Sequence, residues 1–374
     1  MPLLNVRDLG SGPLLGGTIG EKLSASGGRP AGFDYLRLGL SLSIIVIHTV
    51  DICYGPQASI EAWASPLRPL MRAVLPMFFA LSGFLVAGSF IRCKTMFRFF
   101  GLRAIRIYPA LIVEVILSAF LVGPLLSSFS LSEYFTDYRF WVYLLNALGD
   151  PHYELPGLFL NNPNPGLVNR QLWTVPFELG CYVSIAFLAL LGATKRHWLA
   201  PAAALGLAST YGLYQMYRSG GDLSATVGPL SGSLLIVAFL VGVSLYLYRA
   251  TVPLNHGAGI VAGIVGGVLG GWTATGAFIA PIPLAYFTVY LGTLNPQRIG
   301  FVRYADISYG LFLYGYPVQQ TIASIGGWAR IGWINLVASV IVTAAVAFTS
   351  WNLIERPALE LRHWFKRWED GRVQ

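Results

Sequence analysis

Apolar stretches long enough to cross a lipid bilayer recur along this sequence of 374 residues and constrain its fold more than any other feature. A helix that crosses the hydrocarbon core needs about 20 mostly apolar residues. Lipid offers the backbone no hydrogen-bond partners, so such segments cross as helices. We therefore expect an all-α membrane protein, a bundle of about ten transmembrane helices. The qualifying stretches are 33–53, 72–91, 107–127, 171–192, 197–217, 229–248, 255–273, 276–294, 303–325 and 332–353.

Composition supports the same class and argues against several others. Hydrophobic residues make up 55% of the chain and charged residues only 11%, with a mean hydropathy of +0.60. Soluble domains carry about 25% charged residues. We attribute the net charge of +8 to positive residues kept on the cytoplasmic side, and expect no nucleic-acid partner. Cys53, Cys93 and Cys181 are too few and too scattered for a disulfide framework or a zinc site, so we expect no metal.

The distribution of Lys and Arg predicts the orientation of the chain. With a cytoplasmic N-terminus, 18 of the 25 basic residues fall in cytoplasmic segments, six in outer segments and one within the first span. This bias favours an N-in/C-in arrangement. It divides the chain into a flexible cytoplasmic arm (1–32), a transmembrane domain (33–353) and a cytoplasmic tail (354–374). The long outer loop, 128–170, is interpreted as a lid or acceptor-binding loop, or else as a simple connector.

Ionisable residues within the predicted spans are candidates for function, because they are costly there. Arg37 and His48 lie 11 residues apart, which is about three helical turns and about 16 Å of rise on one helix face. Asp51 follows on the same face and could orient the imidazole. A purely structural role for His48, as a hydrogen-bonding group between helices, remains an equal alternative. The further candidates are Glu114, Glu178 and Asp306.

A basic run before the third predicted span ends in Arg103 and Arg106, which share a helix face at the membrane edge. Two guanidiniums placed in this way could clamp a phosphate. Ordinary retention of positive charge on the cytoplasmic side explains most of the run equally well. Glu178 follows about a turn and a half into the fourth span, where it could pair with an arginine or orient a hydroxyl of a substrate.

Several short segments, taken in order, resemble motifs of the acyltransferase-3 family of integral membrane acyltransferases. Each segment is weak alone, but their order and membrane placement are jointly specific, and together they cover residues 33–357. One departure is Gly315, where many members of the family carry a histidine. The matching segments are Arg37 through His48 (R-x10-H), PMFFALSGFL (76–85), RAIRIYPA (103–110), LWTVPFELGCY (172–182), SYGLFLYGYP (308–317) and IERP (354–357).

The resemblance implies an enzyme of a bacterial inner membrane, crossing it several times, that transfers an acyl group, usually acetyl, from acyl-CoA to a carbohydrate hydroxyl. The acceptor would be an extracytoplasmic or lipid-linked glycan, such as an O-antigen, an exopolysaccharide or a lipo-oligosaccharide, and membrane lipids would surround the protein. We assign His48, Asp51 and Glu178 to catalysis, and Arg37, Arg103 and Arg106 to binding of acetyl-CoA. A transporter or flippase of a lipid-linked glycan, and transfer of succinyl rather than acetyl, are the alternatives.

Overall fold

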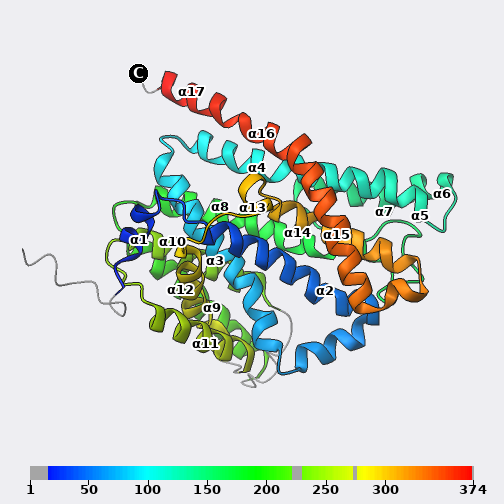
Figure 1. The fold of residues 1–374 in the computed structure, drawn as a ribbon, viewed down its shortest axis with the longest axis horizontal. Coiled ribbons are helices and arrows are strands. Elements are labelled where there is room, and N and C mark those ends of the chain that lie inside the picture. Colours follow the sequence, from blue (N-terminus) through cyan, green and yellow to red (C-terminus); the bar gives the residue numbers. More distant parts are fainter. Residues whose placement is uncertain (1–15, 221–229, 273–275, 373–374) are drawn as a thin grey trace, which may run out of the picture. The chain divides into compact units, whose positions relative to one another are not determined.

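The structure, a computed structural model, describes residues 16–220, 230–272 and 276–372. Within these residues the chain is helical and contains no β-strand; two isolated bridges, Thr18 with Pro253 and Glu154 with Leu167, are the nearest approach to one (Figure 1). The predicted all-α class is therefore confirmed. The first 15 residues of the predicted N-terminal arm lie outside the described residues.

Among the described residues, five helical segments are long and apolar enough to cross a membrane by length and composition. Two more apolar helices, Gly232–Leu247 and His256–Trp272, are shorter. The chain thus has the helices of a membrane protein. The five segments are Gly32–Ala64, Arg68–Arg92, Met96–Leu126, Arg170–Leu190 and Gly332–Gly371.

The chain divides into two compact units. Of the described residues, the first unit holds those within 16–36, 72–88 and 187–298, and in it α10 packs against α9 and α12, and α11 against α12. The central part of α3 (Arg68–Arg92) meets α10 closely, because a Cβ on Gly83 would lie 2.0 Å from the Phe239 carbonyl oxygen. Small residues at a helix contact allow the two backbones to approach in this way. The helices of this unit are α1 (Ile19–Ala25), α9 (Leu199–Arg218), α10 (Gly232–Leu247), α11 (His256–Trp272), η6 (Gly276–Phe278) and α12 (Pro281–Thr293).

The described part of the N-terminal arm is folded. Thr18 caps α1 in a capping box with Glu21, and the amides of Ile19 and Gly20 donate to the carbonyls of Val252 and Arg249 at 3.1 and 2.7 Å. Ile19 is completely buried. Residues 16–25 are therefore attached to the first unit by hydrogen bonds and by one buried apolar side chain.

The second unit comprises residues 37–71, 89–186 and 299–374 and holds the candidate site. In it α14 packs along α15, and α4 contacts η3, α14, α16 and α17. Most of α2 (Gly32–Ala64) belongs here. The other elements are α4 (Met96–Leu117), η2 (Ser118–Val122), α5 (Gly123–Leu126), α6 (Leu131–Thr136), α7 (Tyr138–Tyr143), η3 (Leu144–Leu148), η4 (Arg170–Thr174), α8 (Val175–Leu190, to Ala186), α13 (Phe301–Tyr304), α14 (Ser308–Ser324), η7 (Gly327–Arg330), α15 (Gly332–Ser350), η8 (Trp351–Glu355), α16 (Arg356–Glu360) and α17 (Arg362–Arg372).

Three helix boundaries differ from the sequence prediction in ways that matter for the site. Helix α4 begins at Met96, capped by the Thr95 hydroxyl, rather than at 107, so Arg98, Arg103 and Arg106 of the basic run lie on one helix. The predicted span 303–325 is broken between α13 and α14, which places Asp306 in the break. Helix α2 continues to Ala64 across a kink at Gly55. The φ of Gly55 is 84°, a conformation that would be strained in a residue with a β-carbon, and Pro56 follows it directly.

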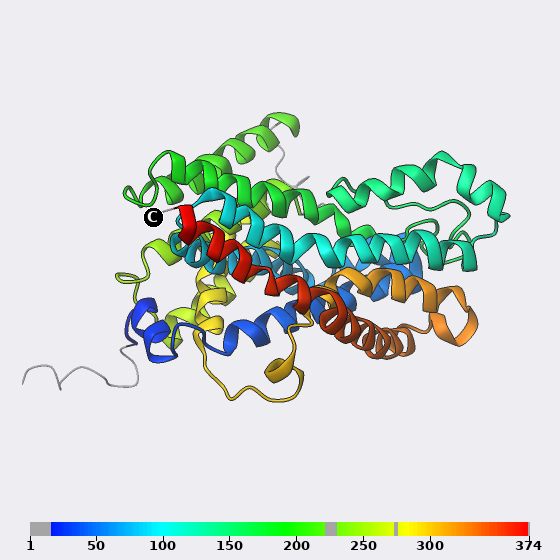
Figure 2. The same ribbon diagram turned by 90° about the horizontal axis from the view of Figure 1, so that it is seen from above.

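The predicted outer loop, 128–170, contains short helices of its own. Figure 2 shows this segment (teal) folding back beside α4, which η3 contacts. Ser130 and Glu133 form a capping box at α6, and Asp137 caps α7. The Arg139 guanidinium bonds the Asp137 carboxylate and holds the pKa of that carboxyl below its usual range. Residues 138–148 form α7 and η3.

Candidate functional site

The face of α2 that carries Arg37 and His48 lies against α14 and the break that precedes it. The Ser41 hydroxyl donates to the Ser308 carbonyl at 2.9 Å. One turn further on, the Gln319 amide donates to the carbonyl of Ile45 at 3.1 Å and to the hydroxyl of Thr49 at 2.9 Å. Since Arg37 and His48 also contact this segment, the predicted shared face of these two residues is consistent with the packing of the helices.

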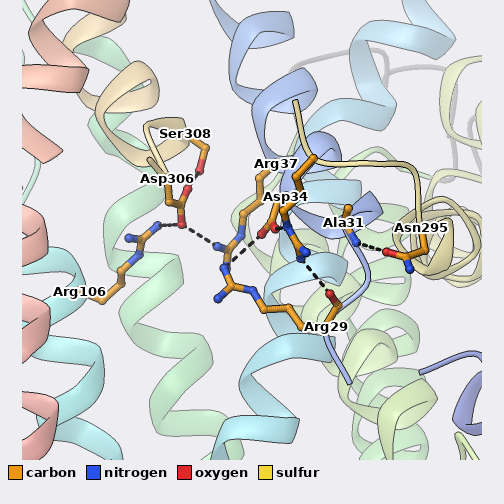
Figure 3. Close-up of polar contacts among 9 residues, drawn as sticks. Arg29, Ala31, Asp34, Arg37, Arg106, Asn295, Asp306 and Ser308 are labelled. Atoms are coloured by element: carbon orange, nitrogen blue, oxygen red, sulfur yellow. Dashed lines mark hydrogen bonds and ion pairs between the residues drawn. The ribbon is translucent and has the colours of Figure 1, made fainter. Parts of the chain in front are cut away.

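Asp306 joins two of the predicted arginines at one end of this face. Its Oδ2 atom accepts from Arg37 Nη1 at 3.1 Å and from Arg106 Nη2 at 2.8 Å, while its Oδ1 accepts from the Ser308 hydroxyl at 2.6 Å (Figure 3). The Arg37 and Arg106 side chains are 28% and 20% exposed. A single carboxylate in a helix break thus gathers arginines from α2 and α4.

Arg106 is also paired with a second carboxylate. Its Nη1 lies 3.7 Å from Glu355 Oε2, and its guanidinium lies 5.7 Å from the centroid of the Tyr309 ring. Glu355 is buried at the end of the π-helix η8, where its Oε1 accepts from the Ser350 hydroxyl. The Tyr314 hydroxyl donates to the same serine oxygen at 3.0 Å. Arg106 is therefore fixed by side chains from three elements.

Arg103 has different surroundings from Arg106, although both belong to α4. Its Nη2 donates to the Ser89 hydroxyl at 3.1 Å, and its guanidinium lies about 6 Å from the rings of Phe99 and Tyr182. Tyr182 in turn donates to Glu178 Oε1 at 2.5 Å. The charges of Arg106, Arg103 and Arg37 all act on Glu178. The three predicted arginines and Glu178 thus form one electrostatic neighbourhood around Asp306. We call the group made up of Arg37, Arg103, Arg106, Glu178, Asp306 and Glu355 the Asp306 cluster.

His48 lies further along α2, half-buried, with its ring edge-to-face against Tyr316 of α14 at a centroid separation of 5.0 Å. The imidazole makes no hydrogen bond to any residue in the described part of the chain. Its nitrogens are thus available to a substrate. The guanidinium of Arg170 acts on the ring electrostatically.

Asp51, which could orient the imidazole by its position in the sequence, instead bonds to the predicted outer loop. Its Oδ2 accepts from Asn164 Nδ2 at 2.6 Å and from Arg170 Nη1 at 2.9 Å, and the Tyr316 hydroxyl lies at 3.5 Å. Asp51 is only 4% exposed. These four residues, the Asp51 cluster, connect to His48 through the ring of Tyr316 rather than through a direct carboxylate–imidazole hydrogen bond.

Sequence reasoning missed several members of these clusters. Asp306 stood out as a charge within a predicted span, and Glu355 belongs to the closing IERP segment, so both carried a signal that was left unassigned. Tyr316, Asn164 and Arg170 carried less: a tyrosine in an apolar helix and polar residues in a loop are common. Only the packing of 161–170 against α2 and α14 brings them to Asp51.

A further carboxylate, that of Asp34 near the start of α2, belongs to the first unit. Asp34 accepts from Arg29 Nη2 at 3.3 Å and from Arg298 Nε at 3.0 Å, and the Asn295 side chain accepts from the Ala31 amide at 3.0 Å (Figure 3). An acidic residue in the first turn of a helix is favoured by the helix dipole. Asp34 therefore has a sufficient structural role at the helix start.

The arrangement offers acid–base chemistry and anion binding. A half-buried imidazole with free nitrogens can accept a proton from a hydroxyl. Guanidiniums held in place by carboxylates can share their remaining N–H groups with phosphate oxygens. No group of three or more His, Cys, Asp or Glu residues able to hold a metal ion occurs among residues 16–220, 230–272 and 276–372.

Comparison with known proteins places these features in a family. A family model described as an acyltransferase domain matches residues 31–352. Nodulation protein 10 of Rhizobium leguminosarum bv. viciae is 29% identical over 92% of this chain and 97% of its own length. An O-acetyl transferase of Shigella phage Sf6 is 25% identical over 87% of this chain and 94% of its own length. No solved structure matches the chain significantly.

Proposed function

The chain belongs to the acyltransferase family whose model covers residues 31–352, and from this premise we propose that it is a membrane O-acetyltransferase. It moves an acetyl group from cytoplasmic acetyl-CoA to a hydroxyl of an extracytoplasmic or lipid-linked carbohydrate, and so modifies a polysaccharide or lipo-oligosaccharide. The similarity to a phage O-acetyl transferase supports the acetyl group.

One observation carries this proposal. Arg37 and His48 lie on the face of α2 that packs along α14, with the Asp306 cluster at one end and the Asp51 cluster at the other. Eleven residues of helix separate them by about 16 Å. That separation is of the order of the pantetheine arm of coenzyme A, so phosphates held at the arginines would bring a thioester near His48.

His48 acts as the general base in this mechanism. An imidazole nitrogen takes the proton of the sugar hydroxyl while the oxygen attacks the thioester carbonyl carbon. The tetrahedral intermediate collapses, the carbon–sulfur bond breaks, and the departing coenzyme A thiolate takes the proton from the imidazolium. A positioned base of this kind contributes about 10²–10⁴ to the rate. An acyl-histidine intermediate is the variant in which the donor reacts first.

The three arginines of the Asp306 cluster have different roles in binding the donor. Arg106 is paired with Asp306 and Glu355, so it chiefly holds the cluster together. Arg103 is bonded to a neutral hydroxyl and two aromatic rings, which leaves its charge the better placed to meet an incoming phosphate. Arg37 lies nearest in sequence to His48 and adds a third guanidinium along the path of the pantetheine arm.

The Asp51 cluster serves the acceptor. Asp51, Asn164 and Arg170 attach the 161–170 segment beside His48, so this segment can position a sugar hydroxyl at the imidazole. Glu178 lies with the arginines rather than at this end, and we assign it to orienting them. The proposed setting is a bacterial inner membrane crossed by about ten helices, with both termini cytoplasmic, as the positive-inside bias indicates.

Transfer of label from radiolabelled acetyl-CoA tests the proposal. Purified protein in liposomes is supplied with a panel of cell-envelope glycans, and His48→Ala is compared with Arg103→Ala. We expect His48→Ala to abolish transfer and Arg103→Ala to raise the KM for acetyl-CoA. His197→Ala, which changes an exposed loop histidine, is the matched control and keeps wild-type activity.

Two outcomes would replace the proposal. Undiminished transfer by His48→Ala would remove the general base, and the structural alternative for this histidine would stand. Failure of the wild type to bind acetyl-CoA would favour a transporter or flippase of a lipid-linked glycan, which also uses buried charges. Transfer from succinyl-CoA in preference to acetyl-CoA would keep the mechanism and change the donor.

A further inference from the structure

A second group of buried polar side chains lies outside the residues used by this mechanism. Glu114 projects from α4, Tyr143 ends α7, and Asn169 immediately precedes η4. Their exposed fractions are 1%, 0% and 0%. All three belong to the second unit, and none was assigned a role from its sequence context.

Most of the polar atoms of these three side chains have no hydrogen-bond partner among the described residues. Glu114 Oε1 accepts from the Ser118 hydroxyl at 2.7 Å, but its Oε2 has none. The Tyr143 hydroxyl and both side-chain polar atoms of Asn169 are likewise buried and without a partner. Buried polar groups are nearly always hydrogen-bonded, so four such atoms in one region require an explanation.

These atoms lie close to one another. The Tyr143 hydroxyl faces the side chains of Ser118 and Asn169, within reach of both but without the geometry of a formed hydrogen bond to either, and the Glu114 carboxylate acts on it electrostatically. Ser118 is also the first residue of the π-helix η2, which follows α4 directly and joins it to α5. A single π-turn inside a helix is rare and occurs most often at functional sites.

The chemistry of the group selects its ligand. Asn169 offers two donors and an acceptor, Tyr143 can donate or accept, and Glu114 Oε2 can accept. A hydroxyl both donates and accepts, so it complements this mixed set. The Glu114 carboxylate disfavours an anion, and one carboxylate with an amide and a phenol is a poor ligand set for a metal ion.

We propose that Glu114, Tyr143 and Asn169 form a binding site for a neutral hydroxyl, supplied either by an ordered water molecule or by a carbohydrate acceptor. The carbohydrate source rests on the proposed function. Asn169 directly precedes Arg170, whose guanidinium bonds Asp51 beside His48. Arg170 therefore belongs to the Asp51 cluster, while its neighbour Asn169 belongs to this site.

Tyr143→Phe tests the proposal, because it removes only the hydroxyl. If that hydroxyl bonds a resident water, the variant loses a hydrogen bond and its melting temperature in detergent falls by about 2 °C, without any substrate. If the hydroxyl has no partner, its removal relieves a buried unsatisfied group and the melting temperature stays level or rises.

Tyr134→Phe is the matched control. Tyr134 is also completely buried in the same segment, but its hydroxyl donates to the Ala119 carbonyl at 2.8 Å. Its loss should lower the melting temperature and leave both KM values unchanged. The control calibrates the shift that one lost hydrogen bond produces in this protein.

Kinetics separate the two sources of the hydroxyl. With radiolabelled acetyl-CoA and the glycan that the panel identifies, a sugar hydroxyl in the site predicts that Tyr143→Phe raises the KM for that glycan about fivefold while the KM for acetyl-CoA is unchanged. A resident water alone predicts the lower melting temperature with both KM values unchanged. A Tyr143→Phe protein as stable as the wild type, with an unchanged glycan KM, would overturn the proposal. The thermal measurement decides this even if no glycan accepts label.

Discussion

The two ends of the α2 face carry the same kind of ion pair in different surroundings. At the Asp306 end, one carboxylate accepts from two guanidiniums, and Arg106 reaches a second carboxylate, Glu355. At the Asp51 end, one buried carboxylate meets a single guanidinium, that of Arg170, whose side chain is 49% exposed. Water and salt screen an exposed charge far more than a partly buried one.

This difference separates two tasks that similar residues perform. The Asp306 cluster joins α2 and α4 to the break before α14 and to η8, so its charges belong to the framework of the unit. The Asp51 cluster attaches the 161–170 segment to the same framework through an ion pair that solvent reaches. We therefore expect changes at the first end to affect stability and donor binding, and changes at the second to affect chiefly the acceptor.

The largest expected effect is on stability at the Asp306 end. Arg106→Met leaves Asp306 and Glu355 with one cation fewer, and removing one partner from a buried pair costs about 3 kcal/mol. Arg170→Met at the other end should cost less than about 1 kcal/mol, because that guanidinium is half exposed. Melting temperatures of the two purified variants compare the costs. Equal losses would remove the distinction between the two ends.

The KM values for the two substrates should respond differently to changes at Asp306 and at Asp51. Asp306→Asn weakens the hold on Arg37 and Arg106, and we expect the KM for acetyl-CoA to rise about tenfold, which corresponds to about 1.4 kcal/mol of binding. Asp51→Asn should raise the KM for the glycan and leave the donor KM unchanged. Steady-state kinetics with each substrate varied in turn measure both. A donor KM that responds equally to both variants would contradict the division.

The contact between α2 and α14, midway between the two ends, can be tested at Gly315. A Cβ at this position would lie 3.0 Å from Ile45 Cγ1 on α2. Gly315→Ala should therefore cost about 1 kcal/mol by overpacking. Ile45→Ala should recover part of that loss when the two changes are combined, because it opens the same space. Additive losses in the double variant would show that this contact is not the cause.

The smallest effect concerns the partly buried pair Asp137 and Arg139 of the outer segment, two residues apart in one short helix start. The hydrogen bond from Arg139 lowers the pKa of Asp137, so this carboxylate stabilises the fold above its unfolded pKa of about 3.9. That contribution is lost as the pH falls through the lower folded value. Asp137→Asn should cost under about 0.5 kcal/mol near neutral pH, and the gap to the wild type should close below about pH 4. Thermal scans across this range measure it, and a gap that widens on acidification would reverse the assigned sign.

The sequence by itself determined the helical membrane class, because apolar stretches of this length have few other stable folds. It also singled out Arg37, His48 and Glu178, since charges and histidine are rare in such stretches, and Arg103 with Arg106 as a pair on one helix face at the membrane edge. Helical periodicity was enough to put Arg37 and His48 on one face, because a regular helix fixes the direction of each side chain.

Only the tertiary structure decided which partners these residues have. Asp306 meets Arg37 and Arg106 across 269 and 200 residues, and Asp51 meets Arg170 across 119. Local spacing placed Asp51 beside His48, but the packing of α14 and the 161–170 segment gave Asp51 other partners. Contacts between distant segments depend on how whole helices pack, and a periodic pattern within one helix carries no information about the residue that faces it.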